Sequence, residues 1–119
     1  MKKERIATRL EKTFLDNIDL LRKNSSRSTY LNLVLRICKK CYTLQTITDD
    51  STFLWNSKFC GDITRLDIYI DEDIYEWIEK KREMFSRSMF IRMLIKRSYR
   101  DWAYKDVERL REICCNITS

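Results

Sequence analysis

The tripeptide SRS occurs twice in this chain, in "NSSRSTYLNLVLR" (24–36) and in "MFSRSMFIRMLIK" (84–96), with Ser26 and Ser86 60 positions apart. In both segments apolar residues follow the tripeptide at helical spacing, which is typical of an amphipathic helix. Serine is a preferred N-cap residue, because its hydroxyl accepts a hydrogen bond from a backbone N–H group of the first turn. Each segment therefore predicts a helix that begins at SRS.

The similarity between the two segments extends well upstream of the tripeptide. A shift of 60 positions aligns residues 5–38 with residues 65–98 without a gap. Six positions are identical, and these are Arg5/Arg65, Ile18/Ile78, Arg22/Arg82 and the three of SRS. Conservative exchanges such as Tyr30/Phe90 and Leu35/Ile95 fall mainly at apolar positions. The sequence therefore contains two copies of one supersecondary unit.

Each copy begins with a short stretch of alternating residues, "RIATRL" (5–10) and "RLDIYI" (65–70). Alternation predicts a strand in which every second side chain lies on the same face. One face would carry the mainly apolar set Ile6, Thr8, Leu10, Leu66, Ile68 and Ile70. The other face would carry Arg5, Ala7 and Arg9 in the first copy and Arg65, Asp67 and Tyr69 in the second.

An amphipathic helix is expected between the strand and SRS in each copy. Its apolar residues are Phe14, Ile18 and Leu21 in the first copy, and Ile74 and Ile78 in the second. Asp71 is a good candidate N-cap for the second of these helices, whereas Glu11 at the matching position is a poorer one. Neither copy can bury its apolar surface alone, so we expect the two copies to pack against each other.

A strand, a helix, an SRS turn and an apolar helix at these spacings resemble the ribbon-helix-helix family of DNA-binding proteins. The resemblance covers residues 5–42 and 65–102, and two copies in one chain look like the tandem regulators of this family found in archaeal viruses. It implies a mainly α fold in which two ribbon-helix-helix units form a pseudo-dimer with a two-stranded antiparallel ribbon. The chain departs from the family pattern at Ser25 and Phe85, where family members often have glycine.

The resemblance also implies which residues meet double-stranded DNA. Its ribbon enters the major groove, so the expected base-contacting residues are Arg5, Ala7, Arg9, Arg65, Asp67 and Tyr69. The N-termini of the two SRS helices are expected at phosphates. The residues expected there are Ser26, Arg27, Ser28, Ser86, Arg87 and Ser88. Because the two ribbon faces differ, we expect an imperfectly palindromic target.

Charge and composition agree with a polyanionic partner. The net charge of +6 lies entirely in residues 1–59, with 12 Lys/Arg against 6 Asp/Glu, while residues 60–119 have 12 of each. The chain has no His and shows no Gly-rich phosphate loop or paired nucleophile and base, so we expect no enzyme activity, cofactor or small-molecule substrate. No apolar run is long enough for a transmembrane helix, and no signal peptide is evident. We expect a cytoplasmic protein.

Two further segments complete the expected organisation, in which residues 1–42 and 63–102 are the two repeats. Residues 43–62 join the copies and contain enough apolar side chains to pack on the bundle, with a helical turn after Asp50. Residues 103–119 predict a C-terminal helix with an apolar face of Ala103, Val107, Leu110, Cys114 and Ile117. This face either packs on its own domain or joins copies of the protein side by side along DNA.

Five cysteines allow a zinc site to be considered, because Cys38 and Cys41 have CxxC spacing and Cys114 and Cys115 form a pair. Cys38, however, lies on an apolar helix stripe, where a free thiol behaves as a small hydrophobe. We therefore expect no metal.

The expected function is a sequence-selective regulator of transcription. Two other functions stay open. One is an antitoxin-like or adaptor module that binds a protein through its tail. The other is non-specific DNA packaging.

Overall fold

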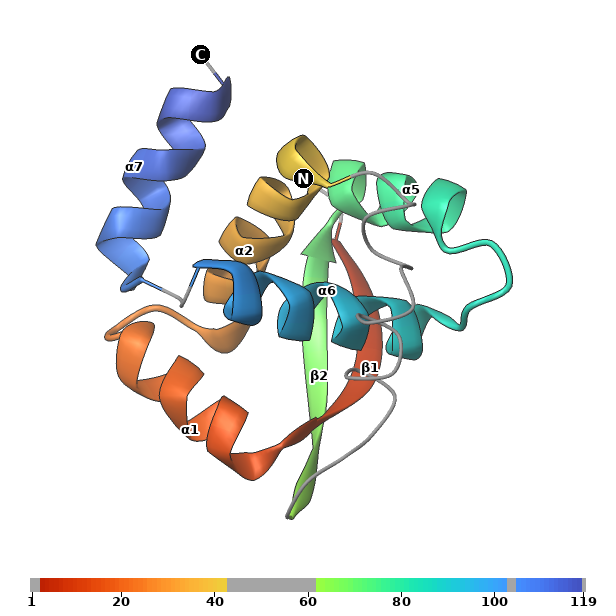
Figure 1. Cartoon of the computed structure of the whole chain (residues 1–119), viewed down its shortest axis with the longest axis horizontal. Coiled ribbons are helices and arrows are strands. Elements are labelled where there is room, and N and C mark those ends of the chain that lie inside the picture. The colour runs from red at the N-terminus through yellow and green to blue at the C-terminus, as the bar shows by residue number, and fades with distance from the viewer. Residues whose placement is uncertain (1–2, 43–61, 103–104, 119) are drawn as a thin grey trace.

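The computed structural model of the protein describes residues 3–42, 62–102 and 105–118 (Figure 1). These residues form a mainly helical protein with one two-stranded antiparallel sheet, as the sequence predicts. The first copy contains β1 (Lys3–Glu11), α1 (Lys12–Leu21) and α2 (Arg27–Cys41). The second copy repeats this order in β2 (Ile63–Asp71), α5 (Glu72–Lys81) and α6 (Arg87–Trp102), and α7 (Val107–Thr118) follows.

The strands of the two copies pair with each other within the chain. The register places Ala7 opposite Asp67 at the centre, with Arg5 opposite Tyr69 on one side and Arg9 opposite Arg65 on the other. Asp67 is also the repeat equivalent of Ala7, 60 positions later. An approximate two-fold axis therefore passes through the Ala7–Asp67 pair and exchanges the two copies.

The core lies between the inner face of this two-stranded ribbon and the helices. Ile68 and Ile70 of β2 and Leu10 of β1 are fully buried, and α2 and α6 pack against the strands (Figure 1). The two SRS helices contribute matched residues to this core. The matched positions that are apolar and fully buried in both copies are Tyr30, Leu31, Val34 and Leu35 in α2, and Phe90, Ile91, Leu94 and Ile95 in α6. The predicted apolar stripes are thus confirmed.

Serine caps both SRS helices, as predicted. The hydroxyl of Ser26 accepts from the backbone N–H of Thr29 at 3.0 Å, and that of Ser86 accepts from Met89 at 3.1 Å. Asp71 does occupy the N-cap position of α5, but its side chain makes no capping hydrogen bond. The carboxylate lies instead 3.1 Å from the guanidinium of Arg36 on α2. An ion pair with the other copy has replaced the predicted cap.

The turn before each SRS helix is also built in the same way twice. Arg22 donates to the carbonyl of Ser25 at 2.6 Å, and its equivalent Arg82 donates to the carbonyl of Phe85 at 3.0 Å. This shared role explains why the arginine is identical in both copies. The residue after each arginine, Lys23 or Glu83, has a positive φ of 54° or 48°.

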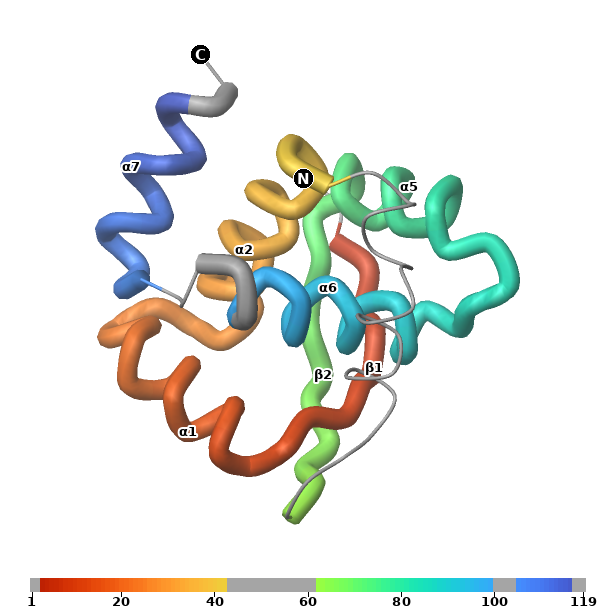
Figure 2. The backbone as a smooth tube through the Cα atoms, in the orientation of Figure 1, coloured from red at the N-terminus to blue at the C-terminus, as the bar shows by residue number. Residues whose placement is uncertain are grey.

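The C-terminal helix α7 packs along α2 (Figure 2). Val107, Leu110 and Cys114 are buried, so the described part of the predicted apolar face is covered by the protein's own domain. The helix begins later than predicted, at Val107, because the carboxylate of Asp106 accepts from the backbone N–H of Arg109 at 3.0 Å and caps it.

Some predictions fall outside the described residues. These are the packing of the linker over residues 43–61, with its helical turn after Asp50, and the position of Ala103. No helix in the described part of the chain is both long and apolar enough to cross a membrane.

Candidate nucleic-acid interface

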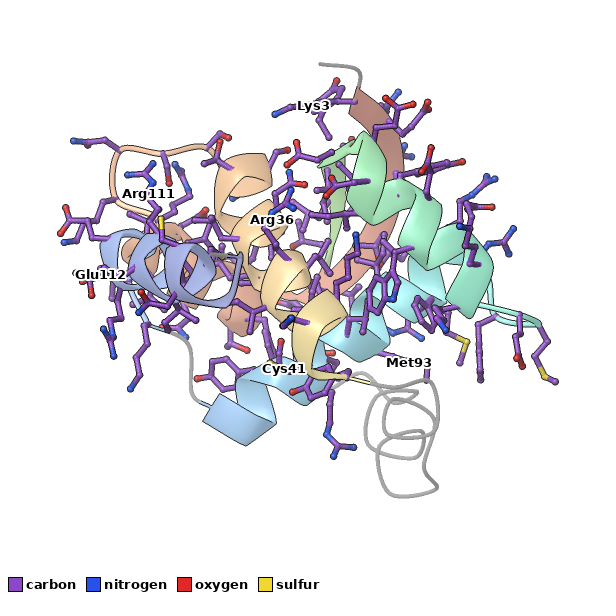
Figure 3. All side chains as sticks on the ribbon, turned by 90° about the horizontal axis from the view of Figure 1, so that it is seen from above. Lys3, Arg36, Cys41, Met93, Arg111 and Glu112 are labelled. Carbon is purple, nitrogen blue, oxygen red and sulfur yellow. The ribbon has the colours of Figure 1, made fainter. Side chains whose placement is uncertain are left out.

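The outer face of the ribbon carries all six residues predicted to contact bases. Their alternation with buried neighbours follows the predicted period of two in both strands. Arg5, Arg9, Arg65, Asp67 and Tyr69 are exposed and Ala7 is half-buried. Lys3, two positions before Arg5, extends the same face, and Figure 3 shows it on the opposite side of the molecule from Cys41 and Met93. The face therefore has four cationic side chains and the carboxylate of Asp67, and at its end Lys3 lies opposite Asp71, with 3.6 Å between Nζ and Oδ1.

The carboxylate of Asp67 lies at the centre of this face and binds two of the arginines. Its Oδ1 accepts from the guanidinium of Arg5 across the ribbon at 3.2 Å and from that of Arg65 on the same strand at 3.2 Å. Partial desolvation opposes ionisation of Asp67. The hydrogen bond from Arg65 and the charges of Arg5 and Arg65 outweigh it and keep the pKa of this carboxyl below its usual value. Asp67 is thus a stable negative centre between two cations.

The N-terminus of α2 is joined to the outer edge of β2 by two side chains. Ser28 Oγ accepts from the backbone N–H of Tyr69 at 2.9 Å. Asn32, a buried residue, accepts from the N–H of Asp71 at 2.9 Å and donates to the carbonyl of Tyr69 at 2.8 Å. These bonds occupy backbone groups that a two-stranded ribbon would otherwise leave unpaired. They fix the height of the helix N-terminus relative to the ribbon face.

The N-terminus of α6 meets the outer edge of β1 differently. Ser88 lies 3.1 Å from Thr8, hydroxyl to hydroxyl, and the Thr8 hydroxyl donates to the carbonyl of Ser88 at 2.8 Å. Arg92 stands at the position of Asn32. The two ends of the interface therefore have the same architecture but unequal chemistry.

The arginines of both SRS motifs are held by carboxylates of the preceding helix. Arg27 donates to Asp19 at 2.7 and 2.6 Å, and the equivalent Arg87 forms an ion pair with Glu79. The hydrogen bond from Arg27 lowers the pKa of Asp19 to about 2. Each guanidinium is thus fixed beside a helix N-terminus, where it keeps its charge but shares it with a carboxylate.

An open hollow connects the ribbon to the N-terminus of α2. Its lining consists of Lys3, Arg22, Ser26, Arg27, Ser28 and Tyr69. Three of the six predicted phosphate-contacting residues are in this set. The first N–H groups of a helix lack intrahelical acceptors. The Ser26 hydroxyl accepts from the backbone N–H of Thr29. The backbone N–H groups of Arg27 and Ser28 can therefore donate to an anion.

A second hollow lies at the other end of the ribbon. Its lining consists of Ala7, Thr8, Arg9, Arg65 and Ser88. It brings together three predicted base-contacting residues and one predicted phosphate-contacting residue, Ser88. Ser86 and Arg87 do not line it.

Lys3, Arg22 and Asn32 were not among the residues predicted for the site. The strand period could have identified Lys3, because it extends the series Arg5, Ala7 and Arg9 by one step. The identity of Arg22 and Arg82 was a signal for a shared structural role. Nothing in the sequence marks Asn32, because the second copy has arginine there.

The cysteines form no metal-binding group in the described residues, where no cluster of three or more His, Cys, Asp or Glu side chains could hold an ion. Cys38 and Cys114 are buried, Cys41 and Cys115 are exposed, and none of these four forms a disulfide within the described residues.

The described residues thus define a small, mainly helical protein with a charged two-stranded ribbon on its surface. Comparisons of the chain with protein-family models, curated proteins and solved structures found no match. What this surface binds is therefore inferred from its geometry and charge.

Proposed function

We propose that the protein is a tandem ribbon-helix-helix pseudo-dimer that binds double-stranded DNA and regulates transcription. The observation that carries the proposal is the outer face of the β1–β2 ribbon, which presents the exposed cations Lys3, Arg5, Arg9 and Arg65. A two-stranded ribbon fits the major groove of B-DNA, and arginine is the side chain best suited to bind guanine O6 and N7 together. The ribbon would enter the groove with this face inward.

Helix N-termini at both ends of the ribbon support the same mode of binding. When a ribbon lies in the major groove of a duplex, the two sugar-phosphate backbones run along the two sides of the ribbon. At the α2 end, the free N–H groups lie in a hollow lined also by Lys3 and Arg22. Such groups position a protein on DNA without reading its sequence. The ribbon would then supply the selectivity.

The reciprocal pairing of the copies supports the pseudo-dimer. Arg36 of the first copy binds Asp71 of the second at 3.1 Å, and Lys96 of the second copy binds Glu11 of the first at 2.9 Å. Together with the ribbon, these contacts interlock two equivalent units in one chain.

A protein adaptor and a packaging protein are the alternatives. The adaptor hypothesis is supported by the larger acidic content of the second copy and by the apolar face of the tail. The described part of that face packs on α2. Packaging requires no base readout, so it predicts equal affinity for any duplex. Self-association through the C-terminal tail, side by side along DNA, stays a prediction.

Selection from random duplexes followed by fluorescence anisotropy over a salt series tests the proposal. We expect the selected duplex to bind at least about 10³-fold more tightly than a scrambled one. The double variant Arg5→Ala/Arg9→Ala should lose most of that preference. The matched control is Lys80→Ala/Lys81→Ala, which removes two exposed charges from α5, away from the ribbon.

Three other results would decide against sequence-selective binding. Equal affinity for both duplexes with a steep salt dependence would indicate packaging. No binding at low salt would reject DNA as the partner. An equal loss in the ribbon and control variants would show that net charge alone drives the binding.

A further inference from the structure

Asp67 is the acidic side chain at the centre of the outer face of the ribbon, and it lies between two arginines. Its Oδ1 binds Arg5 from the first copy and Arg65 from the second, each at 3.2 Å. Arg9, by contrast, has no side-chain hydrogen bond or ion pair within the described residues. If the face only attracted phosphates, a carboxylate at its centre would weaken the attraction, because the negative charge cancels part of the positive potential of the arginines.

We propose that Asp67 is a positioning residue for base recognition, holding the guanidinium groups of Arg5 and Arg65 over the central base pairs. This inference rests on the proposed function and deepens it. An arginine that reads guanine must present two N–H groups in one plane, although its side chain rotates freely in water. A carboxylate that accepts from part of the guanidinium leaves the remaining N–H groups for the base. It also removes rotational freedom before binding, which lowers the entropic cost of association.

The same carboxylate acts against non-specific binding. On a duplex of unrelated sequence, the arginines of the ribbon would interact mainly with phosphates. Asp67 competes with the phosphates for these arginines, and its negative charge repels the DNA backbone. When the ribbon reads the correct bases, the carboxylate faces base edges and can accept from the amino group of cytosine or adenine. Asp67 thus widens the difference between correct and incorrect duplexes, which is what specificity requires.

The position of Asp67 beside the two-fold axis gives a further consequence. Its equivalent across the ribbon is Ala7, so the centre of the interface has one carboxylate and not two. A palindromic DNA site would present the same groups to Ala7 and to Asp67. The carboxylate therefore favours a site with an asymmetric centre and sets the orientation of the protein on it.

The symmetry also provides a matched rescue variant. Exchanging the two residues, in Ala7→Asp/Asp67→Ala, moves the carboxylate to the equivalent place on β1. There it has Arg5 two residues before it on its own strand and Arg65 across the ribbon, the mirror of the present arrangement. A positioning role should be restored by this exchange, whereas a role tied to residue 67 itself should not.

The experiment compares four proteins: the wild type, Asp67→Ala, the exchange variant and Glu76→Ala. Glu76→Ala removes one exposed negative charge from α5 and serves as the charge control. Each protein is put through selection from random duplexes, and its affinity for the selected and scrambled duplexes is measured by anisotropy. Circular dichroism confirms that each variant is folded, which we expect because Asp67 and Glu76 are exposed and Ala7 is only half-buried.

We expect Asp67→Ala to bind the scrambled duplex more tightly and to lose at least about tenfold in the ratio of selected to scrambled affinity. The exchange variant should recover this ratio to within about threefold of the wild type and select the site with its asymmetric centre reversed. If Asp67→Ala and Glu76→Ala shift both affinities by one common factor, the proposal is overturned. It is also overturned if the exchange variant stays as unselective as Asp67→Ala. Failure of the wild type to discriminate between the duplexes would instead reject the proposed function itself.

Discussion

Lys96 on α6 and Glu11 at the end of β1 form a buried ion pair, with 2.9 Å between Nζ and Oε1. Only about 5% and 7% of the two side chains is exposed. The equivalent pair on the other side of the two-fold axis is Arg36 with Asp71, and there the side chains are 28% and 18% exposed. Each pair joins the SRS helix of one copy to the strand end of the other, so the copies are held together at two places of different depth.

The buried pair should be expensive to break from one side only. We expect Lys96→Met to lower the free energy of unfolding by about 3–5 kcal/mol, because it removes the hydrogen-bonded cation from the buried Glu11 side chain. Arg36→Met should cost about 1 kcal/mol, since its carboxylate partners can still be hydrated. Urea unfolding measures both. In the double variant Lys96→Met/Glu11→Gln, part of the loss should be recovered, and additive losses would contradict this account.

Asn32 should matter for stability although it is a polar residue in a mainly apolar helix face. Its replacement by alanine would leave the N–H of Asp71 and the carbonyl of Tyr69 without their partners. We expect a loss of about 1–3 kcal/mol in the free energy of unfolding. Asn24→Ala, at an exposed turn position, is the control and should change stability by less than about 0.5 kcal/mol. Equal effects of the two substitutions would show that the edge contacts are not needed.

Replacement of Glu83 by glycine should stabilise the folded protein. Its φ of 48° is in the left-handed region, which glycine enters without a steric penalty. We expect Glu83→Gly to raise the free energy of unfolding by about 0.5–1 kcal/mol, measured by urea unfolding. Glu83→Ala removes the same side-chain charge and keeps the penalty, so it should not stabilise. A gain for both variants would assign the effect to charge.

The Asp19–Arg27 pair should make stability depend on acid pH. The pKa of Asp19 falls from 3.8 to about 2 in the folded protein. A depressed pKa adds stability that is present above the unfolded value of 3.8 and is lost as the pH falls toward 2.

The variant Asp19→Asn isolates this contribution. We expect it to be less stable than the wild type at neutral pH by on the order of 1 kcal/mol, since the pair is partly hydrated. The difference should shrink as the pH is lowered from about 4 to about 2. A difference that does not change with pH would show that the hydrogen bonds of Asp19, and not its charge, provide the stabilisation.

The sequence allowed much of the fold to be predicted because its pattern is repeated. Strand alternation correctly separated Ile6 and Leu10 from Arg5 and Arg9, and the serine caps were correctly placed. A single copy would have been a short and ambiguous pattern. The second copy in the same register supplied the independent test, since apolar positions coincide only if both segments bury the same face.

Contacts between distant residues could not be predicted in the same way. Asp71 is a residue type that often caps helices, yet its carboxylate forms an ion pair with Arg36 of the other copy. Similarly, the Ser28 hydroxyl accepts a hydrogen bond from the backbone of the ribbon, and Arg27 is paired with Asp19. Both residues were predicted to contact phosphates. Such choices depend on which side chain comes within reach when the two copies interlock. Local propensity contains no information about that.

The pairing of β1 with β2 inside one chain has a consequence for how the proposed DNA binding would depend on protein concentration. A ribbon assembled from two separate subunits falls apart on dilution, so its occupancy of DNA rises steeply with concentration. Here both strands are covalently joined and the complete ribbon exists in every molecule. Occupancy of a single site should therefore increase gradually, with a Hill coefficient of about 1. The joined halves are also free to diverge, because a substitution in one is not copied into the other.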